Sequence, residues 1–119
     1  MIVGDLEERV NIDLQKTAME LRRKIRNAVQ DTANDIVEDV AGKGPHAAPY
    51  KTGNLRASYY AEMISDYEGR VANNVETAPY AIYVELGTRK MAARPHLKPA
   101  AEYHGPKLVE RVREALDVK

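Results

Sequence analysis

The chain has 119 residues, which suits one domain spanning residues 1–119 with its own apolar core. It contains no cysteine, so disulfides and thiolate metal sites are excluded, and its 18 basic residues balance 18 acidic ones, so its net charge favours neither nucleic acid nor an anionic membrane as a partner. No apolar run approaches the roughly 20 residues of a membrane-spanning helix, and the beginning of the chain lacks a signal-peptide pattern. We therefore expect a soluble protein that is made in the cytoplasm.

A long helix is predicted over residues 11–41, because apolar residues recur there at spacings of three, four or seven. The stripe consists of Leu14, Ala18, Leu21, Ile25, Ala28, Thr32, Ile36 and Val40. At 1.5 Å per residue such a helix is roughly 45 Å long, which exceeds what a small domain covers. We expect part of it to project and to be covered by another subunit. Gly42 and the pair Gly44-Pro45 are expected to end it.

A loop is predicted over residues 42–52, which contain two glycines and two prolines. Its length exceeds that of most connections, and long loops are often used for contact. The candidate contact residues in this loop are Lys43, His46 and Tyr50.

A β-hairpin is predicted over residues 57–76 from the alternation of side chains. The side chains expected on one face of the first strand are Tyr59, Ala61 and Met63, and those on one face of the second are Val71, Asn73 and Val75. The turn is expected over residues 66–69, with Gly69 at a positive φ.

Residues 79–86 are ambiguous, because residues 81–86 (AIYVEL) are typical of a strand, but a short helix is favoured, with Pro79 at its first position and Gly87 just past its end. The helix would be apolar nearly all round. Helices of this kind are buried, so we expect Tyr80 and Tyr83 to be covered by the domain itself or by another subunit.

The C-terminal part is predicted to be irregular over residues 87–95, with a short edge strand at its end, and helical over residues 97–119. His104-Gly105-Pro106 is expected to break this last helix in two. The resulting fold class is α+β: a long helix, a small antiparallel sheet, a short helix and a broken C-terminal helix packed on the sheet.

Motifs for catalysis are absent from the sequence, which has no nucleophile elbow, no zinc-protease motif, no P-loop and no dinucleotide fingerprint. His46, His96 and His104 are expected to be solvated histidines rather than metal ligands. The acidic group Asp31, Asp35, Glu38 and Asp39 lies off the apolar stripe and is interpreted as a solvated face. We therefore predict no catalytic, metal or cofactor residues and no enzymatic activity; a small hydrolase with an unrecognised site is the less favoured reading.

A basic run on the long helix leaves one alternative function open. It consists of Arg22, Arg23, Lys24 and Arg26. Clustered cations can bind phosphates, so a nucleic-acid-binding module is the second hypothesis, although no aromatic residue interleaves the run. The competing interpretation is a polar face that meets oppositely charged neighbours, which also suits antiparallel self-association.

Three short stretches are more specific: residues 52–56 (TGNLR), residues 80–88 (YAIYVELGT) and residues 91–100 (MAARPHLKPA). The first predicts a side-chain-bonded turn, with Leu55 entering the core. We expect Arg56 to pair with Glu85, because a charge in an apolar segment needs a partner. Two prolines, at 95 and 99, restrict the entry to the last helix.

In this order, the stretches resemble a family of tailed-bacteriophage tail components, also called neck or tail-completion proteins, which are encoded among the head–tail joining genes of long-tailed phages and prophages. The resemblance covers roughly residues 10–117, and the chain departs from the family pattern at His96, where an aromatic residue is expected, and at the break around Gly105. The residues that carry it are Thr52, Gly53, Leu55, Arg56, Tyr80, Tyr83, Val84, Glu85, Gly87, Thr88, Pro95, Leu97, Pro99 and Ala100.

The resemblance implies a structural protein of neck or tail assembly that acts through protein–protein contacts. Its implied partners are other phage neck or tail proteins and copies of itself, with no small-molecule substrate, no cofactor and no membrane. The implied location is the virion, after assembly in the cytoplasm of the bacterial host. Beside the projecting helix, the expected contact residues are Lys43, His46, Tyr50, Arg89, Met91 and Arg94.

Overall fold

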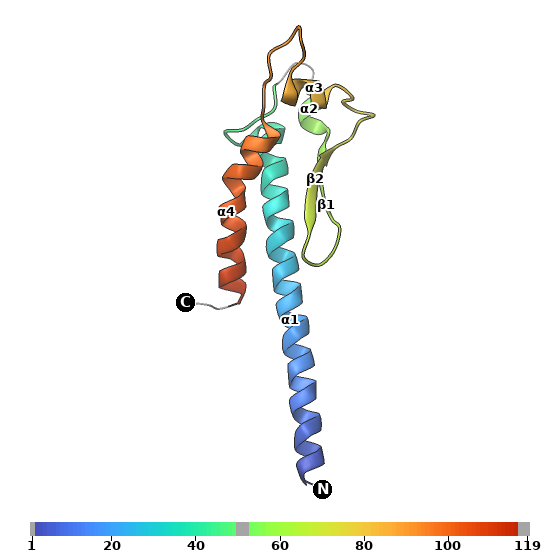
Figure 1. Ribbon diagram of the computed structural model, residues 1–119, viewed down its shortest axis with the longest axis vertical. Helices are drawn as coiled ribbons and strands as arrows, with labels where there is room; N and C mark the ends of the chain where they lie inside the picture. The colour runs from blue at the N-terminus through green and yellow to red at the C-terminus, as the bar shows by residue number, and fades with distance from the viewer. Residues whose placement is uncertain (1, 50–52, 117–119) are drawn as a thin grey trace.

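The spine of the molecule is one long helix, α1 (Ile2–Glu38), which a π-helical turn, η1 (Asp39–Lys43), extends (Figure 1). The computed structural model describes residues 2–49 and 53–116, with side chains described from Leu14 onward. The predicted long helix is confirmed, although it begins earlier than residue 11. Its helical backbone is interrupted within η1 at Gly42, whose φ of 113° lies in the region that glycine tolerates, and Gly44 caps its end.

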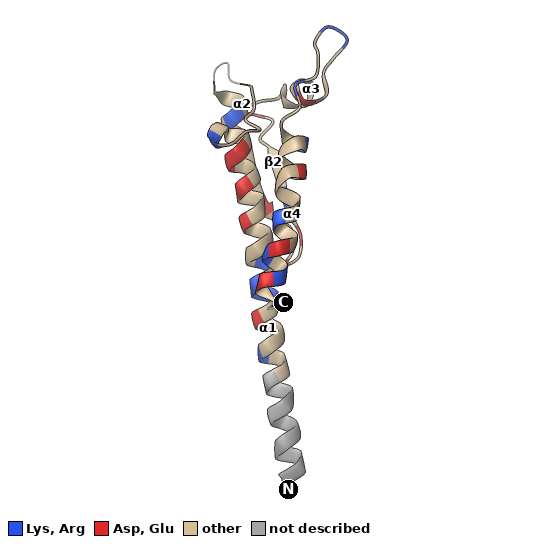
Figure 2. Cartoon of the chain, turned by 90° about the vertical axis from the view of Figure 1, so that its left-hand side faces the viewer, with Lys and Arg blue, Asp and Glu red and all other residues tan. Residues whose placement is uncertain are grey.

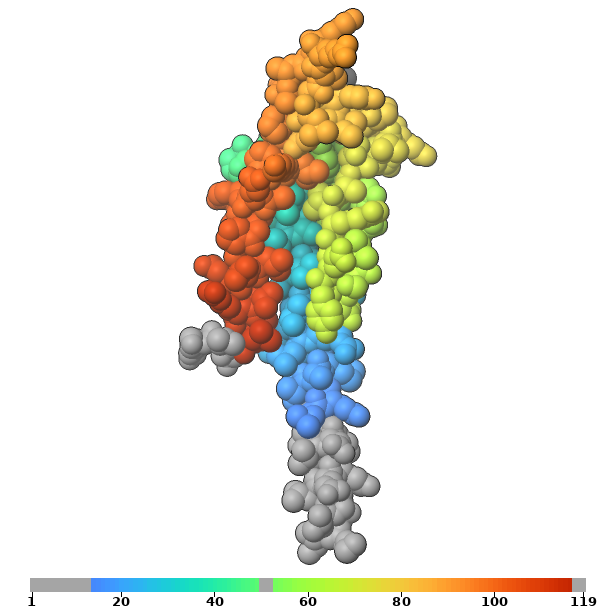
Figure 3. All heavy atoms as spheres, viewed as in Figure 1, coloured from blue at the N-terminus to red at the C-terminus, as the bar shows by residue number. Residues whose placement is uncertain are grey.

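The molecule is elongated, with principal extents of 77 × 31 × 23 Å and a radius of gyration of 20.3 Å. A compact domain of this length has a radius of gyration of about 14 Å. The difference arises because the other elements flank only the C-terminal half of α1, and its N-terminal half projects past them (Figures 1 and 3). The predicted projection is therefore confirmed, whereas its covering by another subunit stays a prediction.

The hairpin consists of β1 (Tyr59–Met63) and β2 (Gly69–Asn73), which pair antiparallel with Tyr59 opposite Asn73. Burial alternates along β1 as predicted. Gly69 does not have the predicted positive φ; it begins β2, and a Cβ there would lie 3.1 Å from Val29 of α1. The absence of a side chain at Gly69 therefore allows β2 to approach α1 closely. Val75 lies in a turn beyond β2 and is exposed, contrary to the prediction.

Three further helices complete the α+β fold: α2 (Asn54–Ala57), α3 (Ala81–Leu86) and α4 (Leu97–Ala115). The predicted break in the last helix is wrong, because α4 continues through Pro106. Gly105 has no Cβ to clash with the proline ring, and α4 packs along α1, where Arg111 pairs with Asp35 at 2.7 Å. The last helix was predicted to pack on the sheet. Instead, α4 and the hairpin each pack against α1. Residues 88–96, all described, contain no edge strand.

The core lies at the end of the molecule where η1, α2, β1, α3 and the first turn of α4 meet. Its buried members are Val40, Ala48, Leu55, Tyr59, Ala78, Ala81 and Ala100. Most of these side chains are small, in keeping with a chain that lacks Phe and Trp. We call this end the apical end. Among the helices that the structure describes, none combines the length and the apolar character needed to cross a membrane.

Candidate protein contact surface at the apical end

The carboxylate of Glu85 fastens α3 to the beginning of α4. It accepts hydrogen bonds from the backbone N–H groups of His96, Leu97 and Lys98 at 2.9, 3.1 and 3.0 Å. These groups lack partners within the helix, and a negative charge is favourable at a helix N-terminus. Burial alone would raise the pKa of Glu85, but these three donors and His96 outweigh it and leave the pKa lowered. Glu85 is thus a capping residue.

The predicted ion pair between Arg56 and Glu85 is wrong. The Arg56 Nε donates instead to the carbonyl oxygen of Ala48 at 2.7 Å and so holds the segment that follows η1. The hydrogen-bond partners of Glu85 are backbone N–H groups. A search of the sequence for oppositely charged side chains does not reveal such partners. The neighbouring prediction is confirmed, because Leu55 is buried in the core.

His96 is buried, contrary to the expectation of a solvated ring. Its Nδ1 lies 3.0 Å from the carbonyl oxygen of Arg94 and 3.2 Å from a carboxylate oxygen of Glu85, so this nitrogen carries a proton and donates. Its Nε2 contacts the hydroxyl of Tyr59. Burial, and to a lesser extent the charge of Glu85, raises the pKa of Tyr59 to about 12. The ring therefore joins β1 to the segment that leads into α4.

A second buried cluster centres on Asp39. Its carboxylate accepts hydrogen bonds from the backbone N–H and the Nδ1 of His46, both at 2.7 Å, and from the Nε2 of His104 at 2.9 Å. Burial would raise the pKa of Asp39, but the hydrogen bonds from both histidines lower it overall. The expectations of a solvated Asp39 and of solvated His46 and His104 are therefore wrong. Gly44 is required here, because a Cβ would lie 2.5 Å from Oδ1 of Asp39.

The two clusters contain residue types that could perform acid–base chemistry, but their polar atoms are engaged with the protein itself. In the described part of the chain, no buried side-chain nitrogen or oxygen lacks a hydrogen-bond partner, and no three His, Asp or Glu residues could hold a metal ion. The Nδ1 of His104 lies 3.4 Å from the Nζ of Lys107, and this ammonium group lies over the ring of Tyr103, 4.7 Å from its centre. Both clusters therefore fix the positions of α3, α4 and the segments between them.

The outward face of α3 is apolar and exposed. The exposed fractions are 41% for Tyr80, 59% for Ile82, 56% for Tyr83 and 71% for Leu86, and Met91 in the following loop has 39%. Burial of Tyr80 and Tyr83 within the domain, one of the two predicted possibilities, is therefore not observed; only Ala81 of this helix is buried. The apolar character of α3 was predicted from the sequence, and the second possibility, that another subunit covers Tyr80 and Tyr83, stays a prediction.

A cationic loop adjoins this face. Gly87, with φ of 78°, reverses the chain after α3, and a Cβ there would lie 2.7 Å from the backbone nitrogen of Ala93. The loop closes on itself through the Thr88 N–H, which donates to the carbonyl oxygen of Met91 at 2.8 Å, and is tied to α3 by the Arg94 N–H. Figure 2 shows basic residues at its tip. We define the apical surface as Tyr80, Ile82, Tyr83, Leu86 and Met91 with Arg89, Lys90 and Arg94.

A hollow of about 580 Å³ opens on the inner side of this surface. It lies between α2, α3 and the loop and is lined by Leu55, Tyr80, Val84, Met91 and Arg94, among others. Tyr80, Met91 and Arg94 of the apical surface therefore also line a hollow.

Residues 4–87 match the model of one protein family, described as bacteriophage HK97-gp10, putative tail-component. They are 84 of the 119 residues of the chain. The chain belongs to this family. The comparisons with curated proteins and with solved structures find no match.

In this tail component the first motif stretch and the second up to Gly87 lie within the matched residues, and Thr88 and the third stretch lie beyond them. Gly53 has a φ of 86° and precedes α2, Ala100 is fully buried in the core, and Leu97 packs against that core. Pro95 and Thr88 are exposed and Pro99 is half-buried. Thr52 and Tyr50 lie outside the described residues, so their predicted roles stay predictions.

The contact residues predicted for this tail component divide between surface and interior. Arg89, Met91 and Arg94 belong to the apical surface, and Lys43 is exposed on η1. His46 is held by Asp39, and its ring lies beside that of Tyr103 in a tilted arrangement, with ring centres 5.1 Å apart. The prediction missed Ile82, Leu86 and Lys90. The signal that could have found the first two was a helix apolar on every side in a domain too small to surround it.

The basic run on α1 is partly used within the tail component itself. Arg26 lies 3.0 Å and Arg22 3.9 Å from carboxylate oxygens of Asp66 in the hairpin turn. Exposed ion pairs of this kind contribute little stability, but they reduce the charge that a phosphate would meet. The remaining cations of the run are Arg23 and Lys24, both exposed.

Proposed function

We propose that this tail component joins the tail to the head or completes the end of the tail, and that its apical surface contacts the neighbouring phage proteins. The observation that carries the proposal is an apolar, cation-edged surface formed by α3, which lies within the residues matched to the family, and by the loop that follows it. Contiguous exposed apolar side chains mark protein-binding surfaces, and interfaces are enriched in Tyr, Met and Arg.

The apical surface is held rigid before any partner binds. Glu85 fixes one end of α3 to α4, and the positive φ of Gly87 with the Arg94 N–H bond fixes the loop. A partner therefore loses little free energy in ordering this surface, and its binding energy comes from covering Tyr83 and Leu86. The cations at the tip favour a partner with carboxylates around an apolar patch, since complementary charge increases the rate and specificity of association.

The proposed role is structural and needs no reaction. The protein would be made in the bacterial cytoplasm and built into the virion, where rings of identical subunits are the expected arrangement of a neck. The contact of the apical surface with another phage protein, and of copies with one another, are both parts of this proposal.

The role can be tested in a phage or prophage that encodes the chain. Ile82→Glu and Leu86→Glu each place a charge in the apical surface, where a partner would have to bury it. We expect lysates with filled heads and separate tails, and the same outcome from a deletion of the gene. Val109→Glu is the matched control, because Val109 is similarly exposed on α4 but lies away from the apical end. Normal infectious particles from the deletion would contradict the role.

A further inference from the structure

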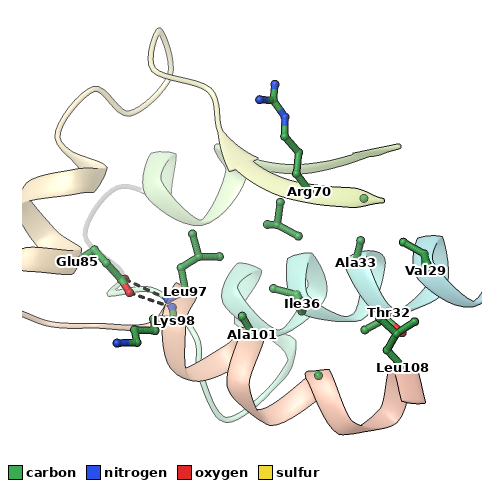
Figure 4. A pocket seen from close by; sticks show the side chains of 13 residues that line it. Val29, Thr32, Ala33, Ile36, Arg70, Glu85, Leu97, Lys98, Ala101 and Leu108 are labelled. Carbon is green, nitrogen blue, oxygen red and sulfur yellow. Dashed lines mark hydrogen bonds between the residues drawn. The ribbon is translucent and has the colours of Figure 1, made fainter. Parts of the chain in front are cut away.

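An apolar groove of about 530 Å³ runs along the molecule between β2 and α4 (Figure 4). Its floor is α1, where the side chains of Val29, Ala33 and Ile36 lie between the strand and the helix α4. Its α4 wall includes Ala101 and Gly105, and a Cβ added at Gly105 would meet nothing within 4 Å. The groove is therefore open and shallow-walled, as a site for another helix requires.

The projecting part of α1 presents a stripe that continues the floor of this groove. The residues on this face recur at spacings of three and four and are Leu14, Ala18, Leu21, Ile25, Val29, Thr32 and Ile36. The last three line the groove, whereas Leu14 is 63% exposed and Ala18 is exposed. Helices gain most of their stability by burying such a stripe, and this part of α1 has no element of its own chain to cover it within the described residues. We call residues 14–21 the projecting segment.

The projecting segment and the groove cannot meet within one chain. Both belong to the same face of one unbroken helix, so the segment cannot fold back onto Val29 and Ile36. A second copy of the chain can bring them together. Because segment and groove share a face, a two-fold axis perpendicular to α1 and close to Ile25 places each segment over the groove of the other copy at the same time.

We propose that two copies of this chain pair antiparallel, each laying its projecting segment in the groove of the other. In this register Leu14 lies opposite Ile36, and Leu21 lies opposite Val29. The spacing of Leu14, Ala18 and Leu21 is the i, i+4, i+7 pattern of helices that bind grooves. A single two-turn contact would be small against the roughly 1,200 Å² that a stable interface buries, and the reciprocal arrangement doubles it.

The pairing uses the projecting segment and the groove and none of the residues of the apical surface. It rests on the contact between copies that the proposed function includes, and it can fail while the contact of the apical surface with another phage protein stands. It also accounts for the small residues of the α4 wall, which let the backbone of a second helix approach. In this register Lys16 lies opposite Asn34 and Arg23 lies opposite Asn27, whereas Lys24 lies opposite Arg26, whose charge is offset by Asp66 at 3.0 Å.

Sedimentation equilibrium of the purified chain tests the pairing. We expect a dimer that Leu14→Glu weakens by about 100-fold, because both symmetric contacts change and each loses about tenfold. Gln15→Glu adds the same charge next to the stripe and leaves the dimer intact. A chain that is monomeric throughout, or a dimer equally tight in both variants, would overturn the proposal.

A cross-linking experiment identifies the surfaces directly, since the chain has no cysteine of its own. Leu14→Cys and Ala101→Cys are prepared separately, mixed, and treated with a short bifunctional maleimide. We expect the mixed product that joins position 14 to position 101, and both substitutions are at exposed positions that leave the fold intact. A product that joins only position 14 to position 14 would show that the segments pair with each other and would contradict the arrangement.

Discussion

The apical end has buried ionisable side chains beside its apolar core and exposed apolar side chains on its surface. Inside, Asp39 and His96 are 3% and 2% exposed, and hydrogen bonds satisfy both. Outside, Tyr83 and Leu86 expose more than half of their surface. Buried polar groups are costly unless they are paired, and exposed apolar groups mark contact sites. The comparison indicates that the buried ionisable residues of the apical end help to hold the fold, and that its exposed apolar residues are available for the contacts that we propose.

The comparison is tested most strongly by removing the buried carboxylate of Asp39. Asp39→Ala leaves the donors of His46 and His104 without their acceptor, and we expect the free energy of unfolding to fall by about 4 kcal/mol. Urea unfolding followed by circular dichroism measures it. Asp31→Ala is the control, because Asp31 is exposed on the same helix and its loss should change the unfolding free energy by less than about 0.5 kcal/mol. Equal effects at the two positions would contradict the role of the buried cluster.

The second largest effect is expected at Glu85. Glu85→Ala removes the acceptor of three backbone N–H groups and the negative charge at the N-terminus of α4, and should destabilise the chain by about 2 kcal/mol. Glu85→Gln keeps one acceptor oxygen and should lose less. Thermal unfolding of both variants measures the difference. If Glu85→Gln is as unstable as Glu85→Ala, the cap does not act through its hydrogen bonds.

Alkaline pH gives a smaller effect that depends on Tyr59. Its pKa is raised from 10.0 to about 12, so the folded chain keeps a proton that the unfolded chain releases. This contribution to stability is complete below pH 10 and is lost as the pH rises through about 12. Between about pH 8 and about pH 11 the wild type should lose about 1 kcal/mol more than Tyr59→Phe, in which this group cannot ionise. The same loss in both proteins would show that Tyr59 does not titrate as its burial requires.

The smallest effect on stability is expected at the apical surface. Tyr83→Ser and Leu86→Ser remove apolar atoms that the folded chain leaves in water, so the unfolding free energy should change by less than about 0.5 kcal/mol. Differential scanning calorimetry measures it. A loss comparable to that of Glu85→Ala would mean that these side chains support the fold, and the contrast between interior and surface would fail.

The elements of the fold were predictable where the sequence is periodic. The apolar stripe from Leu14 to Val40 defines α1, and the alternation around Tyr59 defines the hairpin, because each pattern is set by neighbours a few residues apart. The continuity of α4 was not predictable, since the local preference of Pro106 to end a helix is overcome by packing along α1.

The polar clusters of the site were not predictable, because their members are distant in the sequence. Asp39 and His104 are 65 residues apart, and Tyr59 and His96 are 37 residues apart. From residue types alone, we expected His104 to be a solvated histidine and Asp39 to belong to a solvated face. The sequence did show that α3 is apolar on all sides; whether its own domain covers such a helix depends on the small, alanine-rich core beneath it.

The apical surface is exposed in the free chain, and our central claim is that it is covered in the assembled particle. Leu86→Cys tests it, because this variant has a single thiol at the most exposed position of α3. We expect rapid reaction with a water-soluble maleimide in the purified chain and strong protection in assembled virions, with full reactivity restored when the particles are denatured. Equal reactivity in the free chain and in intact virions would contradict the claim.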